Sequence, residues 1–169
     1  MKRFFLPLAA LALAATSFAV EPAKLLDKAN VLPLALDDAF QFRKTKAFLN
    51  DPKSFKSSPE HMIEFERDRV NYGAITQADR RERWGHYYTF FWRANREAEL
   101  TVRFEYRQQH LGSHVQAKEV HYAKAKGTLK SDFQVTGDDY EQDGKVTAWR
   151  AVLIENGRIV ALNQSFLWN

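Results

Sequence analysis

The chain has 169 residues, of which 27% are charged and 14% aromatic, and it contains no cysteine. The absence of cysteine excludes disulfide bonds, thiol catalysis and cysteine-ligated zinc. The formal charge of +4 falls to +2 if Lys2 and Arg3 are removed with the N-terminal segment described next, leaving 23 basic and 21 acidic residues. Such a near balance argues against a dedicated nucleic-acid-binding protein.

Residues 1–19 show the three parts of a secretory signal peptide. Lys2 and Arg3 give a basic start, residues 4–15 are apolar apart from one proline, and small residues precede a cleavage site after Ala19. The apolar run is shorter than the ~20 residues that a membrane-spanning helix needs. The sequence therefore predicts an exported protein, periplasmic or extracellular, with no transmembrane span after cleavage.

Residues 20–59 are expected to form an N-terminal extension and linker. A short helix is predicted from Asp37 to Leu49, because aspartates suit a helix N-cap and Asn50-Asp51-Pro52 would end it. Residues 54–59 have the composition of a linker. The main domain is then predicted over residues 60–169.

In the main domain, short apolar-rich segments alternate with turns. Residues 98–107 alternate strictly between apolar and polar side chains, which is typical of a half-buried strand. The first predicted strand covers residues 62–70. Because Glu and Arg are good helix formers, a helix is the alternative for this segment. The predicted strands are 62–70, 84–93, 98–108, 114–124, 129–136, 145–155 and 158–168.

The last two predicted strands flank Asn156-Gly157, a strong signal for a β-hairpin because both turn residues must adopt positive φ. A two-residue loop pairs Glu155 with Arg158, whose opposite charges suit facing positions. The same register places Leu153 opposite Val160.

Seven strands in a domain of this size predict an all-β fold, a seven-stranded sandwich of immunoglobulin or fibronectin type III type. One alternative is an α+β fold with a curved antiparallel sheet, if residues 37–49 and 60–69 are both helical. The other is a small outer-membrane β-barrel, which strands of about ten residues would suit. The odd strand count and a last hairpin that is apolar on both faces favour the sandwich.

A binding surface is expected where arginines and aromatic side chains coincide. Residues 67–107 carry nine arginines, which suit an anionic polymer, a phosphate group or an acidic partner. Exposed aromatic side chains would suit stacking on sugar rings. The alternatives are ion pairing with the interspersed acidic residues and burial of the aromatics in the core. The candidate residues are Arg81, Arg83, Trp84, Tyr87, Arg103, Arg107 and Trp168.

Metal binding has only weak candidates. Two histidines flank a turn, and three acidic residues alternate before a glycine in a segment expected to be a solvated turn. An EF-hand loop would need a glutamate where this chain has Arg150. No metal or cofactor is therefore predicted. The candidates are His110, His114, Asp139, Glu141 and Asp143.

The sequence contains no motif that pairs a nucleophile with a base and no phosphate-binding glycine-rich loop. His86 and Asp79 are isolated candidates for a general base. The predicted function is therefore a non-catalytic binding or assembly module of the cell envelope, with an envelope protein or a glycan as partner. The alternatives are a carbohydrate-binding module and a hydrolase whose site no motif marks.

Overall fold

The structure, a computed structural model, describes residues 22–27, 29–54 and 61–168. Most of them lie in strands, so the prediction of a mostly β chain is confirmed. The predicted signal peptide over residues 1–19 and most of the predicted linker over 54–59 lie outside the described residues. The elements in chain order are β1 (Lys24–Leu26), β2 (Phe40–Asn50), η1 (Pro52–Ser54), α1 (His61–Asn71), α2 (Gln77–Arg81), β3 (Gly85–Gln108), β4 (Gln116–Thr136), α3 (Asp138–Asp143), β5 (Val146–Glu155), β6 (Arg158–Gln164) and η2 (Phe166–Trp168).

The described strands form one open antiparallel sheet of six strands, with β3 at its centre. β4 pairs with β3 along almost its whole length, and β1 pairs with one end of β4. On the opposite edge of β3, residues 85–94 pair with β2 and residues 101–108 pair with β5, which continues into β6. β2 and β5 therefore follow one another along the same edge of β3.

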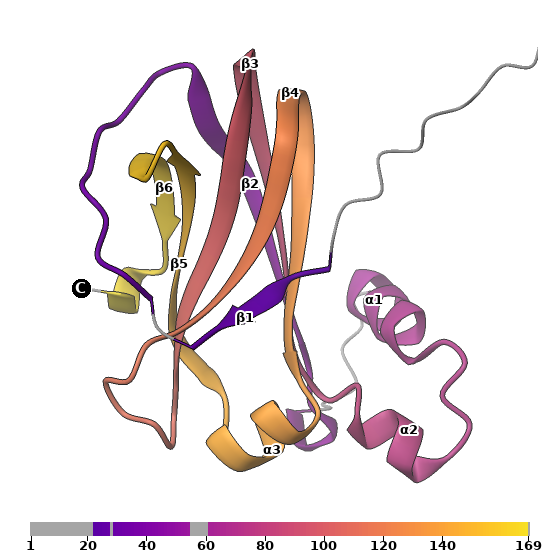
Figure 1. Cartoon of the computed structure of the whole chain (residues 1–169). Coiled ribbons are helices and arrows are strands. Elements are labelled where there is room, and N and C mark those ends of the chain that lie inside the picture. The colour runs from indigo at the N-terminus through magenta and orange to yellow at the C-terminus, as the bar shows by residue number, and fades with distance from the viewer. Residues whose placement is uncertain (1–21, 28, 55–60, 169) are drawn as a thin grey trace, which may run out of the picture.

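The ribbon formed by β3 and β4 bends back on itself, so that its two halves face each other (Figure 1). The pairing register shifts twice between Ala94 and Leu100. Beyond the bend, the ring centroid of Phe104 lies 4.8 Å from that of Tyr88 and 5.3 Å from that of Phe133. We call β2 with residues 85–94 and 127–136 the front layer, and β1, β5 and β6 with residues 98–108 and 116–125 the back layer.

Local sequence and ion pairs both favour the bend. Residues 95–97 are polar and exposed, and Gly127 on the neighbouring strand has a φ of 79°, which glycine adopts at little cost. Arg96 joins three parts of the chain, because its guanidinium lies 3.0 Å from a carboxylate oxygen of Asp37 and 2.6 Å from one of Glu155. The bend is thus tied to the segment before β2 and to the end of β5.

The hydrophobic core fills the space between the two layers. Phe90, Trp92, Phe104 and Tyr106 are completely buried there. The indole Nε1 of Trp92 donates a hydrogen bond of 3.0 Å to Ser131 Oγ, so this polar atom is not left unpaired in the core.

Two helix and strand assignments from the sequence were wrong. The predicted helix over 37–49 is strand β2, because the edge of β3 offers these residues a full ladder of partners, which overrides a weak helix preference. The sheet therefore includes part of the segment expected to be an extension. The predicted strand over 62–70 is helix α1, as the alternative for that segment proposed.

Other differences concern where strands begin and end. The separate strands predicted over 84–93 and 98–108 form the continuous β3, and those over 114–124 and 129–136 form β4. The described part of the chain thus has six strands instead of seven, and the strand order does not establish an immunoglobulin or fibronectin type III fold. The acidic segment predicted as a turn contains the short helix α3.

The predicted Asn156-Gly157 hairpin is confirmed, with φ angles of 49° and 72°. The pairing of Glu155 with Arg158 is also confirmed. The register further along was wrong, because it shifts between Leu153 and Ile154 and places Leu153 opposite Ala161. A β-bulge of this kind puts an extra residue in one strand, and alternation alone does not reveal it.

Candidate functional site

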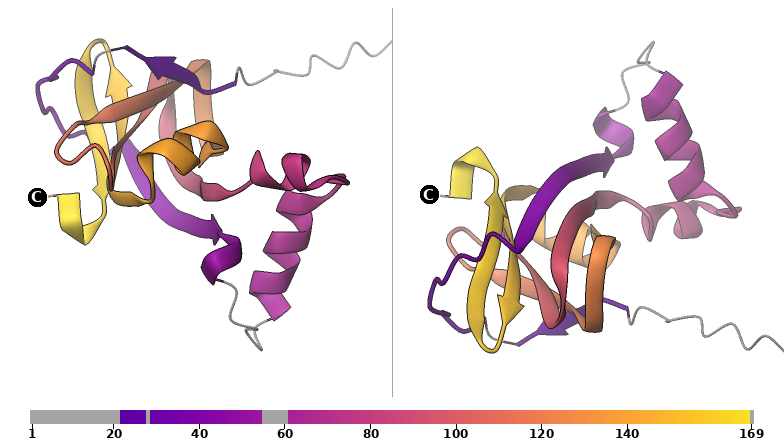
Figure 2. Two further views of the ribbon diagram at one scale, coloured as in Figure 1. Left: turned by 90° about the horizontal axis from the view of Figure 1, so that it is seen from below. Right: turned by 90° about the horizontal axis from the view of Figure 1, so that it is seen from above.

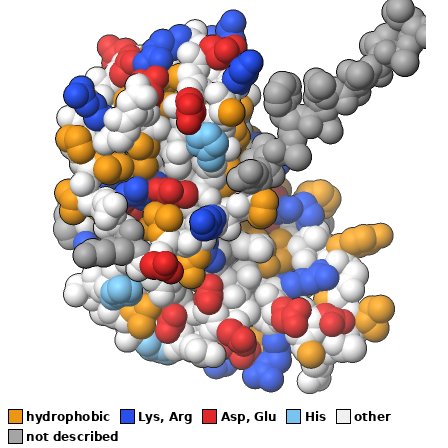
Figure 3. All heavy atoms as spheres, in the orientation of Figure 1, with side chains coloured by type: hydrophobic (Ala, Val, Ile, Leu, Met, Phe, Trp, Pro, Cys, Tyr) orange, Lys and Arg blue, Asp and Glu red, His pale blue; other side chains and the backbone are white. Residues whose placement is uncertain are grey.

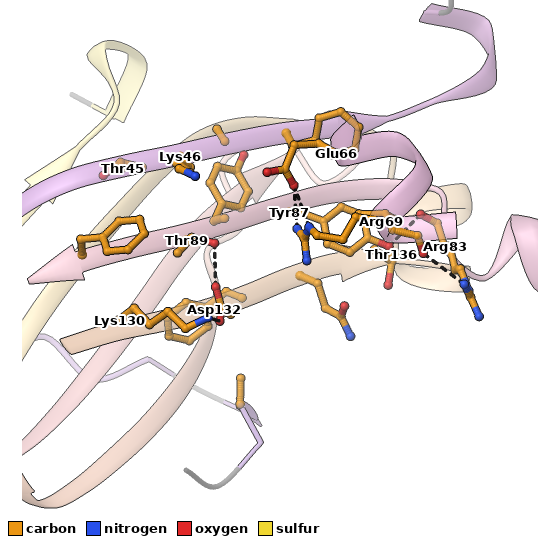
Figure 4. A pocket seen from close by; sticks show the side chains of 18 of the residues that line it. Thr45, Lys46, Glu66, Arg69, Arg83, Tyr87, Thr89, Lys130, Asp132 and Thr136 are labelled. Carbon is orange, nitrogen blue, oxygen red and sulfur yellow. Dashed lines mark hydrogen bonds and ion pairs between the residues drawn. The ribbon is translucent and has the colours of Figure 1, made fainter. Parts of the chain in front are cut away.

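A groove of about 1380 Å³ lies between α1 and the outer face of the front layer (Figure 4). The two helices α1 and α2 stand to one side of the sheet (Figure 2), so this face of β2, β3 and β4 is only partly covered. The floor is lined by Lys44, Lys46, Phe48, Tyr87, Thr89, Phe91, Lys130, Asp132 and Gln134, and the wall by Met62, Ile63, Glu66, Arg69 and Val70 of α1.

The floor is a regular grid, because its three strands pair in register. Directly opposed residues form three rows across the layer, and alternation along each strand places all three rows on the face opposite the core. Neighbouring strands are about 4.8 Å apart, so each row is roughly 10 Å wide. The rows are Phe48–Tyr87–Gln134, Lys46–Thr89–Asp132 and Lys44–Phe91–Lys130.

The floor carries an excess of positive charge. Asp132 is its one acidic side chain, and it accepts a 2.6 Å hydrogen bond from Thr89 Oγ1 and lies 3.2 Å from Lys130 Nζ. Among the residues that the structure describes, Lys44 and Lys46 have no carboxylate within ion-pair distance. Their ammonium groups are therefore available to an external anion.

The end of the floor beneath α1 is more apolar. The rings of Phe48 and Tyr87 lie 6.4 Å apart at an angle of 42°, and Ile63 and Val70 of α1 line the same space. The Tyr87 hydroxyl donates a 2.8 Å hydrogen bond to the carbonyl oxygen of Arg83. Burial raises the pKa of Tyr87 to about 12, so this hydroxyl stays protonated and is unsuited to act as a base.

Arg83 fixes the wall of the groove at the end of α1. Its guanidinium donates a 3.1 Å hydrogen bond to the carbonyl oxygen of Val70 and another to that of Tyr72, which satisfies carbonyls that a helix end leaves free. Asn50 Nδ2 adds a 3.1 Å hydrogen bond to Asn71 Oδ1. The predicted contact residue Arg83 thus has a structural role.

The structure does not bring the seven predicted surface residues together. Arg81 and Trp84 line a second cleft of about 520 Å³ between α1 and α2, where Arg81 is paired with Glu141 at 3.1 Å. Arg103 and Arg107 lie in the back layer, because the bend in β3 separates them from residues 81–87. On the face shown in Figure 3, basic and acidic side chains are interspersed and do not gather into one basic patch.

The predicted aromatic platform is divided as well. Trp168 is only 8% exposed, and its ring centroid lies 4.7 Å from the guanidinium of Arg107 and 5.1 Å from that of Arg150. Trp84 and Tyr87 are half-buried on different sides of α1. These three side chains therefore do not form an exposed row on which a sugar chain could stack.

The residues considered for metal binding do not converge. No group of three or more His, Asp or Glu side chains in the described ranges is arranged to hold a metal ion. His110 Nδ1 is instead 2.7 Å from the carbonyl oxygen of Gln142, and Glu141 is paired with Arg81. Of the other candidates, Asp139 is paired with Lys118 at 3.5 Å, Asp143 accepts a 3.4 Å hydrogen bond from Gln116 Nε2, and His114 lies in the loop between β3 and β4.

The two candidate bases occupy structural positions. Asp79 accepts hydrogen bonds from the backbone N–H of Thr76 and Ile75 at the start of α2, and these bonds lower its pKa. His86 is half-buried on the core side of the sheet, stacked on Tyr88 at 5.9 Å and edge-on to Tyr140. His86 lines neither the groove nor the cleft.

We expect His86 to make stability depend on pH. Burial, followed by the charge of Lys145, lowers its pKa from 6.5 to about 4, although Asp51 acts in the opposite direction. Between these values the unfolded chain binds a proton that the folded protein does not. The stabilisation is thus fully present above pH 6.5 and falls by about 3 kcal/mol as the pH approaches 4.

Urea unfolding between pH 4 and 7 measures this loss, with His86→Phe as the comparison because it keeps an aromatic ring and does not titrate. The variant is expected to lose less stability on acidification than the wild type. An identical pH dependence of the two proteins would contradict the assignment.

Two of the predicted surface residues, Arg83 and Tyr87, line the groove, but the sequence did not point to the rest of its floor. Lys44, Lys46 and Phe48 lie in the segment predicted as a helix, and Phe91 lies in the predicted strand 84–93. The alternating pattern Lys44-Thr45-Lys46-Ala47-Phe48 is the signal that could have identified an exposed strand face there.

Comparisons with known proteins give no relative. No protein-family model matches the chain, and no curated protein or solved structure is significantly similar to it. None of the helices in the described ranges has the length and apolar character needed to cross a lipid bilayer.

Proposed function

We propose that this protein is an exported, non-catalytic binding module of the cell envelope that holds an elongated partner in the groove between α1 and the front layer. The observation that carries the proposal is the floor of the groove, where basic and aromatic side chains stand in three rows on an ordered sheet surface. A site built on strands holds its side chains in fixed relative positions, as recognition requires.

The composition of the groove supports binding. It combines lysines with aromatic and aliphatic side chains, and specific recognition depends on apolar anchoring together with complementary charge. The groove is open and spans three strands, which suits an elongated partner better than a small metabolite, whose sites are usually enclosed. Export is proposed from the signal-peptide pattern of residues 1–19.

The groove also favours binding over hydrolysis. Tyr87 is held protonated and Asp132 is engaged by Thr89 and Lys130. His86 lies on the opposite face of the sheet and does not reach the groove. Thr89 donates its hydroxyl proton to Asp132 in a hydrogen bond, but the ion pair with Lys130 weakens that carboxylate as a base.

A bulky residue in the middle of the floor tests this proposal. Thr89→Trp fills the central position of the grid, and Thr147→Trp places the same residue on an exposed position of β5 in the back layer. Residues 20–169 of each protein would be immobilised and exposed to an envelope extract. We expect saturable capture of a partner by the wild type and Thr147→Trp, and at least about a tenfold loss with Thr89→Trp.

Circular dichroism and thermal unfolding would show that both variants are folded. Capture that is unchanged by Thr89→Trp would place the binding surface elsewhere and overturn the proposal.

A further inference from the structure

The two ends of the groove differ in chemistry. Beneath α1, the floor carries Phe48 and Tyr87, and the wall carries Ile63 and Val70 together with the Glu66–Arg69 ion pair. Two rows further along the strands, Lys44 and Lys130 flank Phe91, and Lys46 lies in the row between. A partner that fills the whole groove therefore meets an apolar slot at one end and a basic surface at the other.

We propose that the partner is an extended acidic peptide segment with an aromatic or aliphatic anchor residue. The anchor occupies the slot beneath α1, and acidic side chains pair with Lys44 and Lys46. This inference rests on the proposed binding function of the groove and specifies the chemistry of its partner.

Spacing favours a peptide. In an extended chain, alternate side chains on one face repeat about every 7 Å, and Lys44 and Lys46 on β2 have the same separation. A peptide lying along β2 can therefore bring alternate acidic residues to the two lysines. Both ammonium groups are exposed and have no carboxylate partner in the described part of the chain, so pairing with the peptide breaks no internal ion pair.

The apolar slot provides the site for the anchor residue of the peptide. Burial of one large apolar side chain against aromatic rings provides a large part of the binding free energy in peptide recognition. Phe48 and Tyr87 lie at 42° to each other and Tyr87 is half-buried, so the two rings do not present one flat exposed surface to a sugar ring. A glycan is therefore the less suitable occupant.

The test uses fluorescence anisotropy with labelled synthetic peptides and residues 20–169. The first probe is an octapeptide with a central Phe-Leu pair flanked by three acidic residues on each side. The second has lysines in place of the acidic residues, and the third has serines in place of Phe-Leu. We expect the first peptide to bind at least about tenfold more tightly than either of the others, with an affinity that weakens as salt increases.

Charge reversal in the protein provides the matched comparison. The double variant Lys44→Glu/Lys46→Glu should weaken binding of the first peptide at least about tenfold. Lys124→Glu/Lys126→Glu changes the net charge equally, at two exposed lysines with the same spacing on β4 near the bend, and should weaken it less than about twofold. Equal losses in the two double variants would overturn the inference.

Two further outcomes separate this inference from the proposed function. If polygalacturonate binds to the wild type and none of the peptides does, the partner is an anionic glycan and the peptide assignment is overturned. If no acidic peptide binds while Thr89→Trp still abolishes capture from the envelope extract, the inference also fails but the groove keeps its proposed function. If Thr89→Trp does not change capture, both the peptide inference and the proposed function of the groove are overturned.

Discussion

Replacement of Gly85 by alanine is expected to destabilise the fold by about 4 kcal/mol or more. Gly85 has a φ of 142°, and a Cβ atom there would lie 2.1 Å from the carbonyl oxygen of Val135 and 2.8 Å from the Cα of Thr136. Both are backbone atoms of β4, so the contact cannot be relieved by a change of rotamer. Gly85 is the first residue of β3 and pairs with both β2 and β4. The substitution is therefore expected to disrupt the end of the groove next to Gly85.

Urea unfolding of the wild type, Gly85→Ala and Gly112→Ala measures this effect. Gly112 also has a positive φ, of 57°, but nothing lies within 4 Å of the added Cβ atom. Gly112→Ala is therefore expected to cost only about 1 kcal/mol, from backbone strain alone. Similar losses in the two variants would show that the close approach of β4 to Gly85 is unimportant.

The second large effect is expected from Arg103→Met, at about 3–5 kcal/mol. Arg103 is only 8% exposed, and its Nε lies 2.6 Å from Glu119 while a terminal nitrogen lies 3.7 Å from the buried carboxylate of Glu105. It also donates a 2.9 Å hydrogen bond to the carbonyl oxygen of Asn30. Removal of the guanidinium leaves the Glu105 charge in the interior with Arg150 as its remaining ion-pair partner.

Arg93→Met is the control, because Arg93 lies on the same strand and is exposed. A change at such a position is expected to stay within about 0.5 kcal/mol. Chemical denaturation of both variants gives the comparison. If Arg103→Met were as stable as Arg93→Met, the network around Glu105 would contribute nothing to stability.

Several arginines of residues 67–107, where the sequence predicted a binding surface, have structural roles instead. Arg83 and Arg103 hold parts of the chain together, and Arg107 lies against the Trp168 ring, so their side chains are occupied. Lys44 and Lys46 of the front layer, by contrast, have no carboxylate partner among the described residues. Whether a basic side chain is structural or available therefore depends on the neighbours that folding brings near.

The features that the sequence predicted are those that depend on neighbouring residues along the chain. Alternation predicted that residues 98–107 form a half-buried strand, and Asn156-Gly157 predicted the hairpin turn, because positive φ at two successive residues restricts the choice of side chain. The absence of cysteine by itself excluded disulfide bonds.

The bend, the assignment of β2 and the groove depend on contacts between distant residues. Whether residues 40–50 become helix or strand is decided by the free edge of β3, which lies 35 residues or more further along the chain. The register of β5 and β6 depends on a bulge that leaves no pattern in the sequence.

By itself, the sequence determined the β-rich composition, the hairpin turn and the lack of thiol chemistry, since each follows from local backbone preferences or residue types. Only the tertiary structure decided which basic and aromatic side chains share a surface. The bend in β3 and β4 sends Tyr87 and Arg103 to different layers, while strand pairing brings Lys44, Phe91 and Lys130 into one row. A binding site assembled across three strands is a long-range property, because its members become neighbours only when the sheet forms.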